Sequence, residues 1–425
     1  MKRRIRLCAA LLTGILALAG CSSNNNIVVN YQKTDDNIQT ITFFGNKYEP
    51  ENVTVIEEII SGFMQENPGI RVSYESLKGS EYYEALEKRM AAGKGDDVIM
   101  VNHDILLKLE AQNQLEDLSG ISTIPEYTGR MLSQMEEDGK IYWVPTTVSA
   151  FGLYCNLDLL EEHKQNVPKT LTQWMETCRY FSDQGILPVI ANNDISLKTL
   201  AIGLGFYPVY QENRQEEVLG RLNQGEEALS QYLTPGFSLV EELIKRGYLD
   251  AQKTLKTQKT SDDLQEFIKG ESPFMLTGAW AAGRVKSMNP KFQFEVVPYP
   301  ALEDGSLLVI NADTRLSVNA EGENVEAAKK FVEYFTRAEN IQKFADQQSS
   351  FSPLKGESPS TVKAIQPLVA CYQSDRTVIG TDRLISLPIW DLTEKATQKL
   401  LAGEPLTEVM AWMDQEAGQE RGVQE

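Results

Sequence analysis

Strand-like and helix-like segments alternate over the first part of this chain. Residues 38–44, 70–75 and 98–101 are rich in apolar, β-branched or aromatic side chains, as in buried strands. Between them, apolar residues recur at helical spacing over 53–63, and a second helix is expected from 80 to 92. A strand–helix–strand–helix–strand order predicts a parallel sheet with right-handed crossovers.

Polar residues follow the ends of these predicted strands. Asn46 and Lys47 come after the first strand, and His103 and Asp104 come after the third. Ligands of such sheets bind beyond the carboxyl ends of the strands, so this edge is a candidate binding surface. His103 is expected to be a surface loop residue rather than a ligand contact.

A second α/β pattern occupies the later part of the chain. Extended stretches at 141–156 and 307–318, and an irregular connection at 349–355, link it to the first pattern. With 425 residues the chain is long enough for two lobes of ordinary domain size.

The N-terminus has the parts of a bacterial export signal. Four basic residues among the first six precede an apolar run over 7–19, which closes on Leu18-Ala19-Gly20-Cys21. The run is shorter than the roughly 20 residues that a membrane-spanning helix needs. Small residues directly before a cysteine indicate a lipoprotein signal peptide over 1–20 and lipidation of Cys21. The alternative is an ordinary signal peptide with a chance cysteine.

The residues that follow Cys21 are polar, and 21–37 are predicted to form a flexible tether. The mature protein would then be held on the extracytoplasmic face of the cell membrane by acyl chains.

Charge and cysteine content exclude several partners. The net charge is −19, which would repel a phosphate backbone and argues against nucleic acid as a partner. Cys155, Cys178 and Cys371 are scattered without C-x-x-C spacing, so they are expected to be buried small hydrophobic residues. No metal site and no cofactor are predicted.

Several stretches together resemble a known family. They are GIRVSYES (69–76), AAGKGDDVIMVNHDILLKLEAQNQLEDL (91–118), IYWVPTTVSAFGLYCNLDLL (141–160), FIKGESPFMLTGAW (267–280) and LPIWDLTEKATQKLLAGEPLTEVM (387–410). The chain resembles the extracellular solute-binding proteins of ABC importers, in particular the carbohydrate-binding branch that includes the maltose-binding protein. The first crossing of the family usually ends Tyr-Asn, whereas this chain has Cys155-Asn156.

The resemblance implies a two-lobe α/β fold of the type II periplasmic-binding-protein kind, with mixed, mainly parallel sheets and a hinge of crossing segments. Lobe 1 is expected to comprise 38–147 and 309–348, and lobe 2 to comprise 148–308 and 349–425. It further implies a monomer that closes on a small-molecule solute, most often a carbohydrate, and delivers it to the subunits of an ABC permease.

The resemblance also assigns ligand-binding residues. Trp280, which follows a strand end and a glycine, and Trp390, which starts a C-terminal helix, match the family's stacking tryptophans. Asp104 matches a sugar-binding aspartate. The alternative roles are core packing for the two tryptophans and a helix N-cap for Asp104.

The remaining candidates are rim groups. Asn46 and Lys47 lie where the family places hydrogen-bonding side chains, although Lys47 fits a solvated charge equally. Asn193 belongs to a polar run, 192–194, after a predicted strand of lobe 2. Ser149 stands where the maltose-binding protein carries a glutamate, so the ligand need not be maltose.

Alternative functions stay open at this point. The same fold could bind a non-sugar ligand or act as the co-receptor of a membrane sensor. A glycoside hydrolase needs only two carboxylates, but no pair stands out, and phosphate-loop, nucleophile-elbow and zinc-protease motifs are absent from the sequence. The chain is therefore predicted not to be an enzyme.

Overall fold

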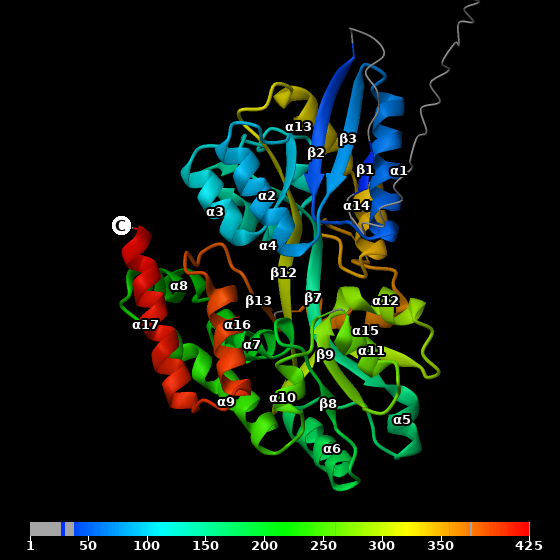
Figure 1. Ribbon diagram of the computed structural model, residues 1–425, viewed down its shortest axis with the longest axis vertical. Helices are drawn as coiled ribbons and strands as arrows, with labels where there is room; N and C mark the ends of the chain where they lie inside the picture. Colours follow the sequence, from blue (N-terminus) through cyan, green and yellow to red (C-terminus); the bar gives the residue numbers. More distant parts are fainter. Residues whose placement is uncertain (1–26, 30–37, 260, 357, 375, 425) are drawn as a thin grey trace, which may run out of the picture.

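Two long strands run from one half of the molecule to the other in the computed structural model (Figure 1). They are β7 (Val144–Asn156) and β12 (Gly305–Val318), which pair antiparallel, for example Ser149 with Asn311. The structure describes residues 27–29, 38–259, 261–356, 358–374 and 376–424. The predicted signal peptide and Cys21 lie outside these residues.

Lobe 1, the upper half of Figure 1, holds the first α/β pattern. Its elements are β1 (Ile27–Val29), β2 (Gln39–Gly45), α1 (Pro50–Glu66), β3 (Ile70–Ser76), α2 (Gly79–Ala91), β4 (Val98–Val101), α3 (His103–Ala111), a 3-10 turn (Ile124–Glu126), α4 (Gly129–Met135), β5 (Glu136–Glu137), β6 (Lys140–Ile141), α13 (Val325–Phe335) and α14 (Ala338–Gln347).

Lobe 2, the lower half, holds the second pattern. Its elements are α5 (Leu157–Glu162), α6 (Leu171–Asp183), β8 (Val189–Ile190), α7 (Ile195–Gln211), α8 (Gln215–Gln224), α9 (Leu229–Lys245), α10 (Ala251–Thr254), α11 (Asp262–Phe267), β9 (Phe274–Gly278), a 3-10 turn (Ala279–Ala281), α12 (Ala282–Ser287), β10 (Phe294–Val297), β11 (Tyr299–Leu302), a 3-10 turn (Lys363–Ile365), α15 (Gln366–Tyr372), β13 (Thr377–Ile379), α16 (Ile389–Leu401) and α17 (Leu406–Gln424).

One mixed sheet continues through both lobes. The order of its main path is β1-β3-β2-β4-β12-β7-β9-β8, and β10, β11 and β13 pair to the side. The predicted parallel ladders of β2 with β3 and of β2 with β4 are confirmed. The crossing strands pair antiparallel with β4, β9 and β10, so the parallel share of the sheet is smaller than predicted. The reason is that the chain leaves lobe 1 along β7 and returns to it along β12, so these two strands run in opposite directions.

The apolar faces of the predicted amphipathic helices are buried in the core. On α1, Val53, Ile56 and Phe63 face the core, and the Phe63 ring meets Phe331 of α13 edge-on at 5.2 Å between centroids. Strand β7 is buried along its whole length because other strands and helices cover it on every side. In lobe 2, α7 is buried on nearly all sides. Residue 236 of α9 is a glycine, and its lack of a side chain lets α9 approach the backbone of α7 at Ala201. This close packing fixes α7, whose first turn faces the space between the lobes.

The predicted tether is not wholly unpaired. Within it, β1 pairs antiparallel with the outer edge of β3, for example Ile27 with Ser76. The other residues of 21–37 lie outside the described part of the chain, and the tether stays a prediction. In the part of the chain that the structure describes, no helix is both long and apolar enough to cross a membrane.

Candidate functional site

A cavity of about 510 Å³ lies between the two lobes. Its walls come from β4 and α3 of lobe 1, from α7 and α16 of lobe 2, and from both crossing strands. Five of the predicted ligand-binding residues line it: Asn46, Asp104, Ser149, Trp280 and Trp390. Residues that are up to 344 positions apart in the sequence therefore meet in one place. We call this cavity the cleft.

Two tryptophans form the apolar part of the cleft. Trp280 lies in the 3-10 turn after β9, and Trp390 is the second residue of α16. Both are half-buried and both rest on the buried Phe151 of β7, with ring centroids 5.1 Å and 5.6 Å away. A side chain at Gly278 would collide with the Trp280 ring, so the glycine permits this position. Rings held in this way on a rigid strand can stack against an apolar face of a ligand.

A buried lysine holds the polar side chains beside Trp390. Lys198 of α7 has no solvent exposure, and its Nζ lies 2.6 Å from Asp194 Oδ1 and 2.9 Å from Glu394 Oε2. The same Nζ lies 4.4 Å from the centroid of the Trp390 ring, a cation–π contact. Lys259 forms a further ion pair with Asp194. Lys198 was not predicted from the sequence, because nothing in a helical pattern shows that one lysine of it will be enclosed.

These ion pairs set the protonation of the two carboxyl groups. Burial alone would raise the pKa of Asp194, but the ammonium groups of Lys259 and Lys198 hold that pKa well below its ordinary value. Burial raises the pKa of Glu394 against the attraction of Lys198, and the charge of Asp194 raises it further. Lobe 2 thus presents a charge network that its own lysines compensate.

The lobe 1 wall contains Asp104 in the first turn of α3. The N-cap of this helix is Asn102, whose Oδ1 accepts a 2.8 Å hydrogen bond from the backbone N–H of Ile105. The alternative role of Asp104 as N-cap is therefore wrong, and its carboxylate is free to face the cleft. Burial raises the pKa of Asp104, and the negative charge of Asp391 on lobe 2 adds to the shift.

His103 was predicted to be a surface loop residue, and this prediction is wrong. The side chain is only 6% exposed and lines the cleft, with Nε2 3.0 Å from the carbonyl oxygen of Ile385. Its Nδ1 is buried without a hydrogen-bond partner. Burial lowers the pKa of His103 to about 4, with help from the positive charge of Arg315. The ring is therefore neutral near neutral pH.

Arg315 of β12 is a second residue that was not predicted from the sequence. It is 4% exposed, donates from Nε to the Ala312 carbonyl at 2.9 Å and lies over the Trp143 ring at 4.3 Å. Its Nη1 is buried without a partner, and burial lowers its pKa to about 10. The signal that could have revealed it is the presence of two charged residues, Asp313 and Arg315, inside a strand-like crossing segment.

Asn46 and Ser149 both line the cleft. A Cβ at Gly45 would lie 2.7 Å from the Tyr74 hydroxyl, so glycine lets β2 end here and bring Asn46 to the cleft. Asn46 Nδ2 donates to the Tyr83 hydroxyl at 3.1 Å, and its Oδ1 is buried without a partner. Ser149 is buried in the β7–β12 ladder opposite Asn311.

Lys47 and Asn193 do not line the cleft. The backbone carbonyl of Lys47 accepts a 2.8 Å hydrogen bond from Tyr74, which ties the loop to β3. Asn193 donates from Nδ2 to the Leu255 carbonyl at 3.2 Å, on the other side of the turn. The next residue, Asp194, takes the place on the cleft wall. The sequence located both loops but not which residue in each would face the ligand.

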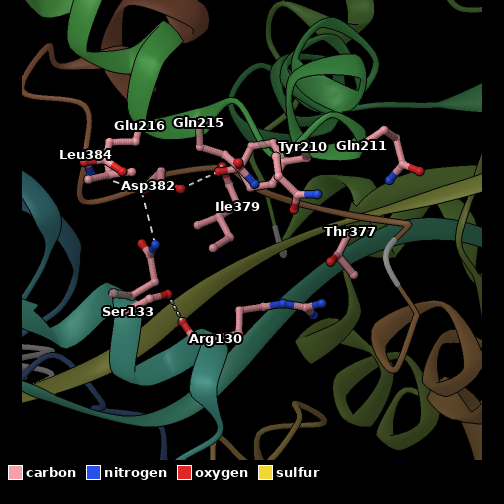
Figure 2. Close-up of a pocket in the computed structure, with 12 residues that line it drawn as sticks. Arg130, Ser133, Tyr210, Gln211, Gln215, Glu216, Thr377, Ile379, Asp382 and Leu384 are labelled. Carbon is pink, nitrogen blue, oxygen red and sulfur yellow. Dashed lines mark hydrogen bonds between the residues drawn. The ribbon is translucent and has the colours of Figure 1, made fainter.

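A second cavity, of about 460 Å³, lies behind the segment that follows β13 (Figure 2). Thr381 lines the cleft and Asp382 lines the second cavity, so this segment separates the two. Asp382 is buried and accepts hydrogen bonds from Gln134 Nε2 of α4 at 3.1 Å and from the Tyr210 hydroxyl of α7 at 2.5 Å. It therefore links lobe 1 to lobe 2 behind the cleft.

Comparison with known proteins assigns the family. The family model of bacterial extracellular solute-binding proteins matches residues 47–342, and the chain belongs to this family. The multiple sugar-binding protein of Streptococcus mutans is 24% identical over 379 residues, covering 85% of this chain and 87% of the relative.

Solved structures show the same fold. Apo RafE of Streptococcus pneumoniae superposes with a TM-score of 0.74 at 21% identity, covering 92% of this chain and all of RafE. RafE in complex with raffinose gives a TM-score of 0.72 at 22% identity, covering 90% of this chain and 99% of that one. The predicted two-lobe solute-binding fold is thereby confirmed.

Proposed function

We propose that this protein is the lipid-anchored substrate-binding protein of an ABC importer, and that it binds an oligosaccharide in the cleft. The observation that carries the proposal is the pair of tryptophans on Phe151, surrounded by carboxylates and amides from both lobes. Sugars present apolar C–H faces and hydroxyl edges, which rings and polar rims recognise respectively. The sugar-binding name of the Streptococcus mutans relative and the raffinose bound to RafE support the same ligand class.

The mechanism we propose is closure of the lobes on the ligand. The ligand-binding residues are Trp280, Trp390, Asp104, Asn46 and Ser149, with Asp194 in place of Asn193. Bending would occur where the chain crosses between 147 and 148, between 308 and 309, and between 348 and 349. Closure is favoured when the ligand contacts both walls, because only the closed form gains both sets of contacts.

Delivery and location complete the proposal. The mature protein would act as a monomer, held by acyl groups on Cys21 at the outer face of the cell membrane, and would hand its ligand unchanged to the permease subunits. Cys21→Ser should release the protein from the membrane fraction, whereas Cys371→Ser, which changes a cysteine inside the folded body, should not. Membrane retention of the Cys21→Ser protein would contradict the anchor.

Sugar binding is tested on the full-length protein purified in detergent. A thermal-shift screen of raffinose, maltotriose and other oligosaccharides should raise the melting temperature for one ligand class, since a native-state ligand stabilises by mass action. Calorimetry on the hits should show saturable binding with no sugar product released. Absence of binding to every saccharide, or turnover of the ligand, would overturn the proposal.

In cells, deletion of the protein should abolish uptake of the sugar. Loss of a transcriptional response alone would indicate a sensor instead.

A further inference from the structure

Among the described residues, the acidic side chains of the cleft fall into two groups. Asp194 and Glu394 are ion-paired with Lys198. Asp104, Asp313 and Asp391 also line the cleft, but none of the described Lys or Arg side chains forms an ion pair with them. They come from α3 of lobe 1, from the crossing strand β12 and from α16 of lobe 2. Carboxylates without an ion pair therefore line the ligand space from both sides, and Arg315 is a positive charge of the same cleft that attracts Asp104 and Asp313.

Buried polar atoms on the lobe 1 wall also lack partners. His103 Nε2 faces a backbone carbonyl, which can only accept, so Nε2 carries the proton and Nδ1 is left as a bare acceptor. Nδ1 of this 6% exposed residue and the Oδ1 of Asn46 are both buried without a partner. The unpartnered donor on the same wall is Nη1 of Arg315, which is 4% exposed. A buried polar atom without a partner is destabilising, so a ligand that supplies the missing partners binds more tightly.

These groups require hydrogen-bond donors more than acceptors. A ligand hydroxyl brings one donor together with lone pairs, which would face carboxylates and other acceptors. An ammonium group brings three donors, no acceptor and a positive charge. The buried Nη1 donor of Arg315 suits a ring hydroxyl or ring oxygen of the same ligand.

Closure of the lobes strengthens the requirement for a positive charge on the ligand. When water leaves the cleft, like charges on the two walls repel more strongly because the local dielectric constant falls. Burial is the main cause of the raised pKa of Asp104, and repulsion by Asp391 adds to it. A cation between the walls would turn the repulsion into attraction.

We infer that the ligand is an amino sugar, an oligosaccharide with at least one protonated amine placed between Asp104 and Asp391. The inference rests on the proposed function, since it names the class of saccharide that the same cleft takes. The two tryptophans would stack on sugar rings, and the ammonium group would bridge the carboxylates of the two lobes.

The test compares ligands that differ in one group. Full-length protein in detergent is titrated calorimetrically, at a slightly acidic pH, with the glucosamine trisaccharide, with its N-acetylated counterpart and with raffinose. The free amine is charged and the acetylated one is neutral, while the sugar backbone is the same. We expect the glucosamine trisaccharide to bind at least about tenfold more tightly than the N-acetylated form, as a charge-assisted hydrogen bond predicts.

Variants locate the effect. Asp391→Asn and Asp104→Asn should each reduce this preference about tenfold, because each removes one of the facing charges. Glu408→Gln, on an exposed position of α17, changes the net charge equally and should leave the preference unchanged. A preference that survives in both aspartate variants would overturn the assigned position of the amine.

The outcomes separate this inference from the proposed function. Equal or tighter binding of the N-acetylated trisaccharide or of raffinose would overturn the amino-sugar inference and leave sugar binding intact. Binding of spermidine, a polyamine without a sugar ring, in the absence of any saccharide binding would overturn both.

Discussion

The two walls of the cleft differ in how their polar groups are satisfied. On lobe 2, Lys198 is enclosed by Asp194, Glu394 and the Trp390 ring, so the charges of these two carboxylates are compensated within the lobe. On lobe 1, His103 and Asn46 keep buried atoms without partners. The lobe 2 wall is therefore organised before a ligand arrives, whereas the lobe 1 wall is completed only by what binds.

This difference indicates an order of events. A prepared surface with two aromatic rings loses little conformational entropy on binding, so a ligand should dock on lobe 2 first. The unpartnered groups of lobe 1 then gain their missing hydrogen bonds when the lobes close. The free energy of closure thus comes mainly from lobe 1 contacts. Three substitutions and a change of pH test this contrast between the walls and the link behind them.

Lys198→Met should break the organisation of lobe 2. The substitution keeps the length of the side chain but leaves Asp194 and Glu394 close together without the lysine between them. Removing one partner of a buried pair costs about 3 kcal/mol of unfolding free energy. Urea unfolding followed by circular dichroism measures the loss. Lys245→Met, which removes an exposed pair with Glu241 on α9, should cost well under 1 kcal/mol, and equal losses would contradict the contrast.

Acid should act on lobe 1 through His103. The unfolded ring takes up a proton below a pH of about 6.5, whereas the buried ring does so only near its pKa of about 4. The unfolded state therefore binds more protons between these values, and the unfolding free energy falls as the pH falls, by up to about 3 kcal/mol. Urea titrations at several pH values should show a smaller loss for His103→Gln. Identical pH profiles would show that the ring is not buried.

Trp280→Ala should weaken ligand binding without unfolding lobe 2. Loss of one stacking surface costs about 1–3 kcal/mol of binding free energy for a sugar or base. Calorimetry with the saccharide that binds most tightly measures the change. Trp412→Ala, on α17 and outside the cleft lining, is the matched control and should bind normally. Unchanged affinity in Trp280→Ala would place this ring outside the site.

Tyr210→Phe tests the link behind the cleft, where the lobes are already connected without a ligand. It removes the hydroxyl that donates to Asp382, and it should cost about 1 kcal/mol of stability in urea unfolding. Tyr207→Phe on the same helix α7 should cost less, since the Tyr207 hydroxyl forms no hydrogen bond with another described residue. A larger effect at Tyr207 would contradict the role of Asp382 as the connecting residue.

The order of elements and the location of the site follow from the sequence alone. The alternation of strand and helix patterns over 38–104 predicts β2, β3 and β4 as parallel neighbours, and each strand end carries polar residues. Trp280 was predictable because it lies two residues after the glycine that ends a strand. The stretches 141–156 and 307–318 were also predicted to be extended, and they form β7 and β12.

Which of several neighbouring residues face the cleft depends on the assembled lobes. Asn192 Oδ1 accepts a 3.0 Å hydrogen bond from the backbone N–H of Ile195, and Asn193 donates to Leu255. Of the three residues 192–194, Asp194 alone lines the cleft. The enclosure of Lys198 depends on Glu394, a residue from the other end of the chain. Local periodicity reports which side of one element is apolar, whereas burial and ion pairing depend on what a distant element brings to that side. For this physical reason Lys198, His103 and Arg315 could not be assigned until the lobes were assembled.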